Sequence, residues 1–351
     1  MKPYERSAIS NLTVAAVLIV VVVAAVGAYS FYTYYYVAKP PSPLLVDSAD
    51  LYTTESGYLY SGFSNATGVP YAAPRSAGST ALAAQIRAGS PVSVFISVSK
   101  SALEPSLLGN RSAGWGVAFV NDQMSIGYSS ASGQPVGFQT VLNDYQKAVA
   151  TNATSAWNSF FVDLTAGSVK VGISNPNTDP AGYRGWMVLE AAGQALDGDK
   201  SYFVNRLIDA RANVTGANAA ALVAPLQEGQ IQFLLLYKSA ALSHGLNAML
   251  LPRHINLGDF TLGSYYSQFT YTTSTGVQKG GPILLFVTVP NNATETTQAL
   301  NFVVYLVQHS STLSSYGLVV LSPALLYNST DVPSPIASLL SQGLLKESGP
   351  I

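Results

Sequence analysis

The stretch VKVGISNPNTDPAGYRGWMVLEAAGQAL, residues Val169–Leu196, joins a strand pattern, a long turn and a helix pattern. The run Val169–Ser174 is short, apolar and rich in β-branched residues, which predicts a buried strand. Pro180–Leu196 reads as a helix, and Asp179 and Pro180 are the residue types that commonly cap and begin one. A chain that repeats such strand–turn–helix units has α/β architecture.

The same alternation continues on both sides of this stretch. Further strands are predicted over Pro91–Ser99, Pro282–Pro290 and Gly116–Ser129, the last of them interrupted by a polar centre. Further helices are predicted over Ser79–Gly89, Ala217–Gly229 and Thr296–His309. Neither an internal repeat nor a low-complexity linker divides this part of the chain, so we expect one cooperative unit with two lobes.

Composition argues against several classes of function. Charged residues make up 10% of the chain and the formal net charge is -1, so no basic surface for nucleic acid is expected. The chain has no cysteine, and its three histidines lie in unrelated contexts without metal-ligand spacing. A nucleophile elbow is absent, and GQALDGDKS from Gly193 departs from a phosphate-binding loop. We therefore predict neither an enzyme nor a cofactor.

The first residues suggest attachment to a membrane. Thr13–Val37 carries no charge and is long enough, as a helix, to cross a hydrocarbon core of ~30 Å. Lys2 and Arg6 favour a cytoplasmic position for the short flank. We predict a head at 1–12, a single-pass transmembrane anchor at 13–37 and a proline-rich spacer at 38–46.

Two alternatives remain open for this segment. It could be a cleaved secretory signal, or a pilin-type (class III) archaeal signal that is processed between the basic head and the apolar run. All three interpretations place Val46 and the following residues outside the cell. The exterior part also holds six glycosylation sequons, which predict a glycoprotein. The sequons begin at Asn65, Asn110, Asn152, Asn213, Asn292 and Asn328.

Three segments resemble the start of a helix that could hold an anion, because free backbone N–H groups and the helix dipole favour negative charge there. The first follows LLVDSADLY and contains Thr53, Thr54 and Ser56. The second contains Ser76, Gly78 and Ser79, and the third contains Asp179. Ordinary helix capping is the alternative for each of them, but three together favour a shared anion cleft.

Five segments in fixed order extend this pattern over most of the exterior part, from about Leu51 to Leu340. They are RSAGSTALAAQI with VSVFISVS, GVAFVNDQMSIGYS, SNPNTDPAGYRG, LLLYKSAALSHGL and LPRHINLGD. Together they resemble the tungstate- and molybdate-binding proteins of ABC importers, in particular the archaeal branch. The third segment is similar to the Asp-Pro-x-x-Asp-Pro-x-Gly-Tyr-Arg signature of that family.

The resemblance implies an α/β fold of the second periplasmic-binding-protein type, in which two crossover strands join two lobes. Lobe 1 would comprise 47–122 and 283–351, and lobe 2 would comprise 123–282. It also implies that a molybdate or tungstate ion is held between the lobes and delivered to an ABC permease with its ATPase. By motif, the ligand-binding residues would be Ser56, Ser79, Asp179, Tyr183 and Tyr237, with Arg184 as a structural ion-pair partner.

The sequence departs from the family pattern at four positions. Leu236 stands where the family has Glu, and Lys238 where it has Arg. Asn175 and Ser93 each replace an Asp. Asp179 is then the one carboxylate that the motif leaves to face the metal centre. Two other functions therefore stay open: binding of another oxyanion or small solute, such as sulfate or phosphate, and a pilin-like role in a surface assembly.

Overall fold

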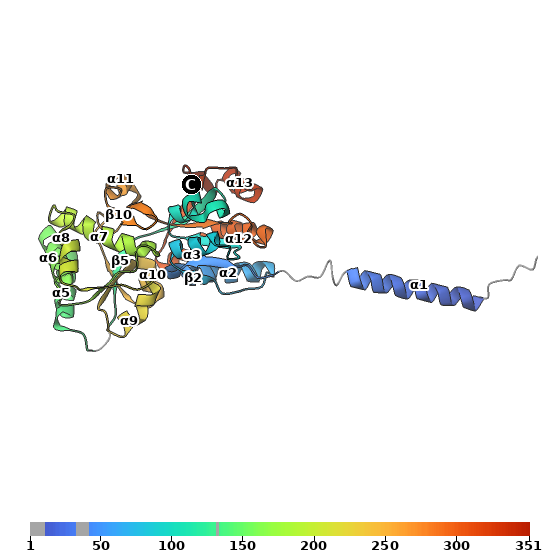
Figure 1. The fold of residues 1–351 in the computed structure, drawn as a ribbon, viewed down its shortest axis with the longest axis horizontal. Helices are drawn as coiled ribbons and strands as arrows, with labels where there is room; N and C mark the ends of the chain where they lie inside the picture. Colours follow the sequence, from blue (N-terminus) through green and yellow to red (C-terminus); the bar gives the residue numbers. More distant parts are fainter. Residues whose placement is uncertain (1–10, 33–41, 131–132) are drawn as a thin grey trace, which may run out of the picture. The chain divides into compact units, whose positions relative to one another are not determined.

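The computed structural model describes residues 11–32, 42–130 and 133–351. The chain forms two units, Met1–Ser42 and Pro43–Ile351 (Figure 1). In the first unit, α1 (Asn11–Tyr32) contains the stretch Val14–Tyr32, which is long and apolar enough to cross a membrane. Its length and composition suit a membrane anchor and a signal segment equally well. The predicted basic head, with Lys2 and Arg6, lies outside the described residues.

The second unit is a two-lobed α/β structure built around two separate sheets. The sheet of lobe 1 has seven strands in the order β14-β13-β4-β12-β3-β1-β2. Its strands are β1 (Val46–Ala49), β2 (Arg75–Ala77), β3 (Val94–Ser97), β4 (Trp115–Asp122), β12 (Ile283–Thr288), β13 (Val319–Asn328) and β14 (Leu345–Glu347). β1, β2 and β3 are parallel to one another, whereas β12 is antiparallel to β3 and to β4.

The sheet of lobe 2 has five strands in the order β7-β6-β8-β5-β9. They are β5 (Met124–Tyr128), β6 (Val171–Gly172), β7 (Asn213–Val214), β8 (Phe233–Tyr237) and β9 (Asn247–Leu250). A separate hairpin of β10 (Thr270–Thr273) and β11 (Gly276–Lys279) follows β9 in the chain. The two-lobed, mixed α/β fold expected from the sequence is thus confirmed.

The polar centre of the predicted strand Gly116–Ser129 is the place where the chain passes from one lobe to the other. β4 ends at Asp122 in the first sheet and β5 begins at Met124 in the second, with Gln123 between them. The chain returns to lobe 1 at β12, which begins at Ile283. The lobe limits at 122/123 and 282/283 stay a prediction, as does the spacer 38–46.

Helices flank the sheets of both lobes (Figure 1). Lobe 1 carries α2 (Thr53–Thr67), α3 (Ser79–Arg87), α4 (Pro105–Leu108), α12 (Thr296–His309) and α13 (Ser334–Ser341). Lobe 2 carries α5 (Val136–Thr151), α6 (Thr154–Leu164), α7 (Pro180–Leu196), α8 (Tyr202–Asp209), α9 (Val223–Gln227), α10 (Lys238–Ser243) and α11 (Gly263–Tyr266). The helix predicted over Ala217–Gly229 is shorter, because a 3-10 turn, η5 (Ala220–Leu222), precedes α9.

The long turn before α7 is explained by how closely the helix approaches the strand that precedes it. A Cβ atom on Gly182 would lie 2.3 Å from the carbonyl oxygen of Ser174, so only glycine fits at this point. Most of α7 is buried, including Met187 and Leu189. The turn therefore folds the first residues of α7 back onto the end of β6, at the side of lobe 2 that meets lobe 1.

Candidate functional site

The start of α7 presents a buried carboxylate to lobe 1. Asp179 is the N-cap residue, Pro180 is the first helical residue, and Asp179 Oδ1 accepts a hydrogen bond from the Ala181 N–H at 3.0 Å. Asp179 Oδ2 accepts a second one from the Ala219 N–H at 2.8 Å. The predicted cap is confirmed, and the carboxylate also fixes the loop that leads into η5.

The start of α3 lies directly opposite, in lobe 1. Its N-cap residue is Gly78, and the hydroxyl oxygen of Ser79 accepts a hydrogen bond from the Val98 N–H at 3.1 Å. Ser79 is fully buried and does not cap its own helix, so ordinary capping is wrong for this residue. The hydrogen bond found for its hydroxyl is one that it accepts, which leaves its proton free to be donated.

The two helix starts touch. The Ala81 N–H of α3 donates to the Thr178 carbonyl oxygen at 3.2 Å across the lobe junction. A Cβ atom on Gly78 would lie 2.3 Å from that same oxygen and 2.9 Å from the Cα atom of Asp179. Two helix N-termini from different lobes thus converge on one point, and both favour negative charge there.

Asp50 is a second carboxylate at this point, and the sequence analysis missed it. It begins the 3-10 turn η2 (Asp50–Tyr52) directly after β1, and its Oδ2 accepts from the Ala220 N–H of lobe 2 at 3.1 Å. Asp50 of lobe 1 and Asp179 of lobe 2 therefore accept from two consecutive backbone N–H groups of lobe 2, those of Ala220 and Ala219. A polar residue at the carboxyl end of a parallel strand is the signal that could have identified it.

The two carboxyl groups interact electrostatically. Burial, and next to it the charge of Asp179, raise the pKa of Asp50 to about 8. Burial also raises the pKa of Asp179, against the opposing effect of its hydrogen bonds from Ala181 and Ala219. Like charges in a desolvated site cannot both ionise readily, so at neutral pH the pair retains a proton.

Aromatic side chains and one arginine border the carboxyl pair. Tyr183, on α7, donates from its hydroxyl to Ser99 of lobe 1 at 3.3 Å. Arg184 donates to the Tyr237 hydroxyl at 2.7 Å and to the Val98 carbonyl oxygen at 2.8 Å. No carboxylate of the described residues lies within ion-pair distance of Arg184, so the expected ion pair is not formed.

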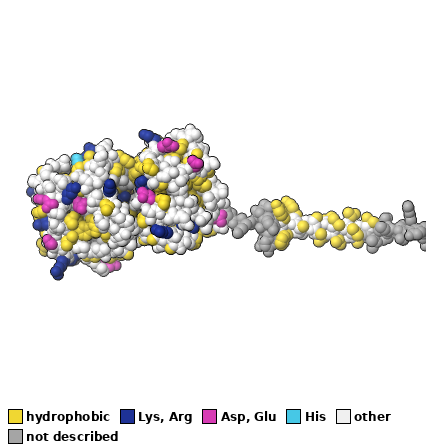
Figure 2. All heavy atoms as spheres, turned by 45° about the horizontal axis from the view of Figure 1, so that its top comes forward, with side chains coloured by type: hydrophobic (Ala, Val, Ile, Leu, Met, Phe, Trp, Pro, Cys, Tyr) yellow, Lys and Arg dark blue, Asp and Glu magenta, His cyan; other side chains and the backbone are white. Residues whose placement is uncertain are grey.

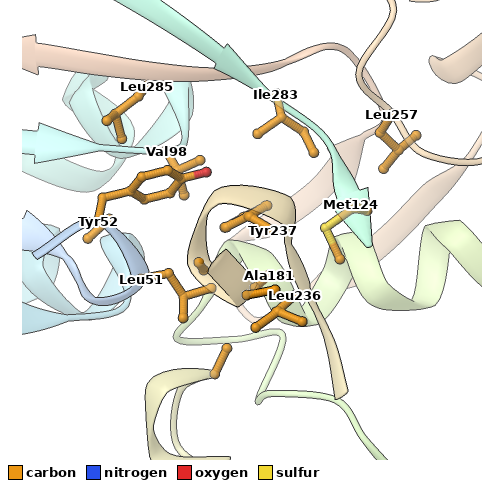
Figure 3. Close-up of a cluster of buried hydrophobic side chains, with 14 of the residues drawn as sticks. Leu51, Tyr52, Val98, Met124, Ala181, Leu236, Tyr237, Leu257, Ile283 and Leu285 are labelled. Carbon is orange, nitrogen blue, oxygen red and sulfur yellow. The ribbon is translucent and has the colours of Figure 1, made fainter. Parts of the chain in front are cut away.

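Figure 3 shows the apolar part of this junction, with Tyr52 of lobe 1 and Tyr237 of lobe 2 in one buried cluster. The two ring centroids are 5.4 Å apart. Leu236 belongs to the same cluster, and a Cβ atom on Gly127 of β5 would lie 2.7 Å from its side chain. Leucine at this position is thus explained by packing between β8 and β5.

The structure brings four of the five predicted ligand-binding residues to the lobe junction: Ser79, Asp179, Tyr183 and Tyr237. Ser56 is placed differently, because it lies on α2 and its hydroxyl is hydrogen-bonded to Ser48 of β1 at 2.8 Å. No contact found among the described residues connects Ser56 with the other four. Asp50, and not Ser56, is the polar residue that follows β1 and faces lobe 2.

Two of the other buried carboxyl groups, those of Asp122 and Glu55, lie away from this point. Asp122, at the crossover, accepts from the Tyr52 hydroxyl at 2.9 Å and from the Ser239 hydroxyl at 2.5 Å, so it ties both lobes to the hinge. Neither carboxylate oxygen of Glu55 on α2 has a hydrogen-bond partner among the described residues. Burial raises the pKa of Glu55 to about 7.

Within the described ranges, no group of three or more His, Asp or Glu side chains is arranged to hold a metal ion. The site can instead offer the hydroxyl protons of Ser79 and the tyrosines, the guanidinium of Arg184 and a carboxyl pair that holds a proton. This set of groups suits a small anion that is bound between two lobes and shielded from water.

Comparisons with known proteins identify a family and several relatives of this chain. The family described as bacterial extracellular solute-binding protein matches residues 36–319. A protein named as an uncharacterized solute-binding protein of Saccharolobus solfataricus is 38% identical over 312 residues, which cover 86% of this chain and 76% of the relative. The molybdate/tungstate-binding protein WtpA of Thermococcus kodakarensis is 32% identical over 167 residues, which cover 41% of this chain and 46% of that protein.

A solved structure is similar in fold. The periplasmic molybdate-binding protein of Azotobacter vinelandii aligns with a TM-score of 0.54 and 15% identity. The alignment covers 79% of this chain and 100% of that protein. At this level of identity the similarity concerns the two-lobed fold.

Proposed function

The chain belongs to the family of bacterial extracellular solute-binding proteins, and from this premise we propose that it captures molybdate or tungstate between its two lobes. In this proposal the loaded protein delivers the oxyanion to an ABC permease and its ATPase. The relatives found are named solute-binding proteins, which carry cargo and are not enzymes.

The observation that carries the proposal is the meeting of two helix N-termini at the lobe junction. The starts of α3 and α7 face each other, and the nearby N–H groups of Ala219 and Ala220 are bound by the carboxylates of Asp179 and Asp50. Side-chain carboxyl oxygens thus occupy positions at which backbone N–H groups point. An incoming oxyanion would compete for the same donors, together with the Ser79 hydroxyl.

The carboxyl pair supports a choice among oxyanions. A carboxylate repels sulfate and phosphate, whereas molybdenum and tungsten are large enough to accept an additional oxygen ligand. Asp179 would be that ligand. Asp50 keeps a proton at neutral pH, because its pKa is raised to about 8, and a protonated carboxyl group can donate a hydrogen bond to the anion. Asp50 is thus a second carboxyl group at the junction, in a chain in which Leu236 stands where the family has a glutamate.

We further propose that α1 holds the protein in the cell membrane with a single pass, so that the binding unit lies outside. The supporting observation is the apolar stretch Val14–Tyr32, together with a family description that is extracellular. The binding unit should then stay with the cells when they are washed. Protease added to the intact cells should remove it. Release into the medium of a chain that lacks α1 would indicate a cleaved signal instead.

Calorimetric titration of the full chain in detergent with molybdate, tungstate, sulfate and phosphate tests the oxyanion proposal. We expect molybdate or tungstate to bind most tightly. Ser79→Ala should weaken that binding by roughly 10- to 150-fold, since a hydrogen bond to a charged group contributes about 1.5–3 kcal/mol. Ser56→Ala is the matched control, because it also removes a buried hydroxyl, and it should leave the affinity unchanged.

Two results would contradict the proposal. The first is an absence of heat with all four anions. The second is an equal loss of affinity in Ser79→Ala and Ser56→Ala, because the effect would then not come from the lobe junction.

A further inference from the structure

A cavity lies at the lobe junction, and it shares only its border, Tyr183 and Arg184, with the proposed oxyanion site. It has a volume of about 670 Å³. Lobe 1 lines it with the 3-10 turn η3 (Lys100–Leu103) and with α4, and lobe 2 lines it with the β10–β11 hairpin and the first turn of α7. We call it the hairpin pocket. Asp50, Ser79 and Asp179 do not line it, so it is distinct from the carboxyl pair.

The volume of the hairpin pocket is larger than the volume of an oxyanion. A tetrahedral oxyanion has five non-hydrogen atoms and fills on the order of 150 Å³, if each atom takes roughly the volume of a water molecule. Pockets of roughly 300–1,000 Å³ are typical for organic ligands and cofactors. The pocket is thus large enough for a molecule of sugar or small-metabolite size.

The charges that line the pocket are mainly positive. They comprise Lys100, Arg184 and Lys279 against Glu104. Lys100 lies 3.6 Å from Glu104, so that acidic group already has a basic partner. No hydrogen bond or ion pair is found for the Lys279 side chain among the described residues, and basic side chains stand near the lobe junction in Figure 2. Lys279 is thus left without a carboxylate partner, and Arg184, which donates to Tyr237 and Val98, has none within ion-pair distance among the described residues.

The rest of the lining combines hydroxyl groups, amides and rings. Ser99 and Thr275 offer hydroxyls and Gln278 an amide, whereas Phe286 and Tyr327 offer aromatic faces. Such a mixture suits a ligand whose body carries hydroxyl groups on an apolar frame. A purely apolar ligand would leave the polar groups unsatisfied, which costs binding free energy.

We infer that the hairpin pocket binds a small organic anion whose acidic group, a carboxylate or a phosphate, is placed between Arg184 and Lys279. Its hydroxylated body would extend along η3 and the hairpin. The walls come from both lobes, which are already joined here by the hydrogen bond from the Ser101 hydroxyl to Gln278 Oε1 at 3.3 Å. A ligand in the pocket therefore favours the joined arrangement of the lobes.

Three sugars test this inference with the full chain: glucuronate, glucose 1-phosphate and glucose. We expect saturable binding of at least one of the two acids at millimolar concentrations and much weaker binding of neutral glucose. Preference for one acid identifies the acidic group as carboxylate or phosphate. Failure of both acids to bind, or equal binding of glucose, would overturn the inference.

Charge reversal locates the bound acid. Lys279→Glu should weaken acid binding roughly tenfold, because it replaces an attraction by a repulsion at an exposed position. Lys147→Glu is the matched control, since Lys147 is an exposed lysine on α5 that does not line the pocket. Equal affinities in the two variants would overturn the inference.

The same variants separate this inference from the oxyanion proposal. Lys279→Glu should leave molybdate affinity within about threefold, whereas Ser79→Ala should leave acid binding unchanged. Molybdate binding without binding of the acids would refute only the hairpin pocket. The reverse result would refute only the oxyanion site.

Discussion

Replacement of Gly78 by alanine should hold the lobes apart without harming either lobe. The new Cβ atom would lie 2.3 Å from the carbonyl oxygen of Thr178, and ordinary contact begins near 3.4 Å. The two backbones must therefore separate by about 1 Å. Gly78 itself has φ -58° and ψ 142°, which alanine adopts without strain, so the start of α3 keeps its conformation.

The expected cost follows from the contacts at this point. A separation of 1 Å breaks the hydrogen bond from the Ala81 N–H to Thr178, now 3.2 Å long, which contributes about 0.5–1.5 kcal/mol. The methyl group that Gly78→Ala adds also overpacks a close contact, which costs roughly 1–3 kcal/mol more. Together they disfavour the joined lobes by about 2 kcal/mol or more, which corresponds to at least a ~30-fold loss of affinity for any ligand held by both lobes.

Calorimetric titration with molybdate and small-angle scattering with and without molybdate would measure this effect. Gly263→Ala is the matched control, because a Cβ atom there would meet only Pro282, at an ordinary 3.8 Å. Gly78→Ala should bind weakly and stay expanded, whereas Gly263→Ala should behave like the parent chain. An unchanged affinity and radius of gyration in Gly78→Ala would refute the idea that the ligand is enclosed at the meeting of α3 and α7.

Three further predictions concern charge and packing. With the lobes joined, the pKa of Asp50 is raised to about 8, so the contribution of Asp50 to the stability of the joined arrangement is complete below pH ~4 and is lost as the pH rises through about 8. Scattering at pH 9 should therefore show an expanded parent chain, and Asp50→Asn should abolish this expansion. Glu55 has a pKa raised to about 7 from its usual 4.5, so the free energy of unfolding should fall by roughly 3 kcal/mol between these pH values. Denaturant unfolding of Glu55→Gln should lack that fall, and an identical pH profile would contradict the assignment. Leu236→Glu should lower the free energy of unfolding at neutral pH by about 3 kcal/mol or more, because it buries a charge in an apolar cluster, whereas Leu236→Met should cost less than about 1.5 kcal/mol.

Much of the fold was predictable because local chemistry decides it. The helices Pro180–Leu196 and Thr296–His309 have the bounds that their sequence patterns predict. The break in Gly116–Ser129 was visible as polar residues inside an apolar run, and it is the crossover between sheets. The helix over Ala217–Gly229 was predicted too long, since its first residues form the loop whose N–H groups bind Asp179 and Asp50.

The site was less accessible to sequence reasoning, because its contacts join residues that lie far apart in the chain. Asp179 and Ser79 could be found as helix starts, a local property. The pattern marks Asp50 only as a polar residue at the end of a strand, whereas its role depends on Ala220, 170 residues away. Similarly, Arg184 was expected to pair with a carboxylate, but the fold places a tyrosine hydroxyl and a backbone carbonyl within its reach.

Leu236 stands where the family has a glutamate, and Asp50 supplies a carboxyl group from the other lobe. Within the proposed function, these two features together make oxyanion binding depend on pH. A glutamate on β8 would belong to lobe 2, the lobe of Asp179, so its charge would act on the ligand in every arrangement of the lobes. Asp50 belongs to lobe 1 and accepts from the Ala220 N–H of lobe 2, next to the Ala219 N–H that binds Asp179, so it lies near Asp179 while the lobes are joined. Joining the lobes must then take up a proton near neutral pH, because two buried carboxylates cannot both stay charged. The affinity for an oxyanion should therefore increase as the pH falls. In a chain with both Asp50→Asn and Leu236→Glu, the affinity should not depend on pH until the pH reaches the range in which the new glutamate is itself protonated.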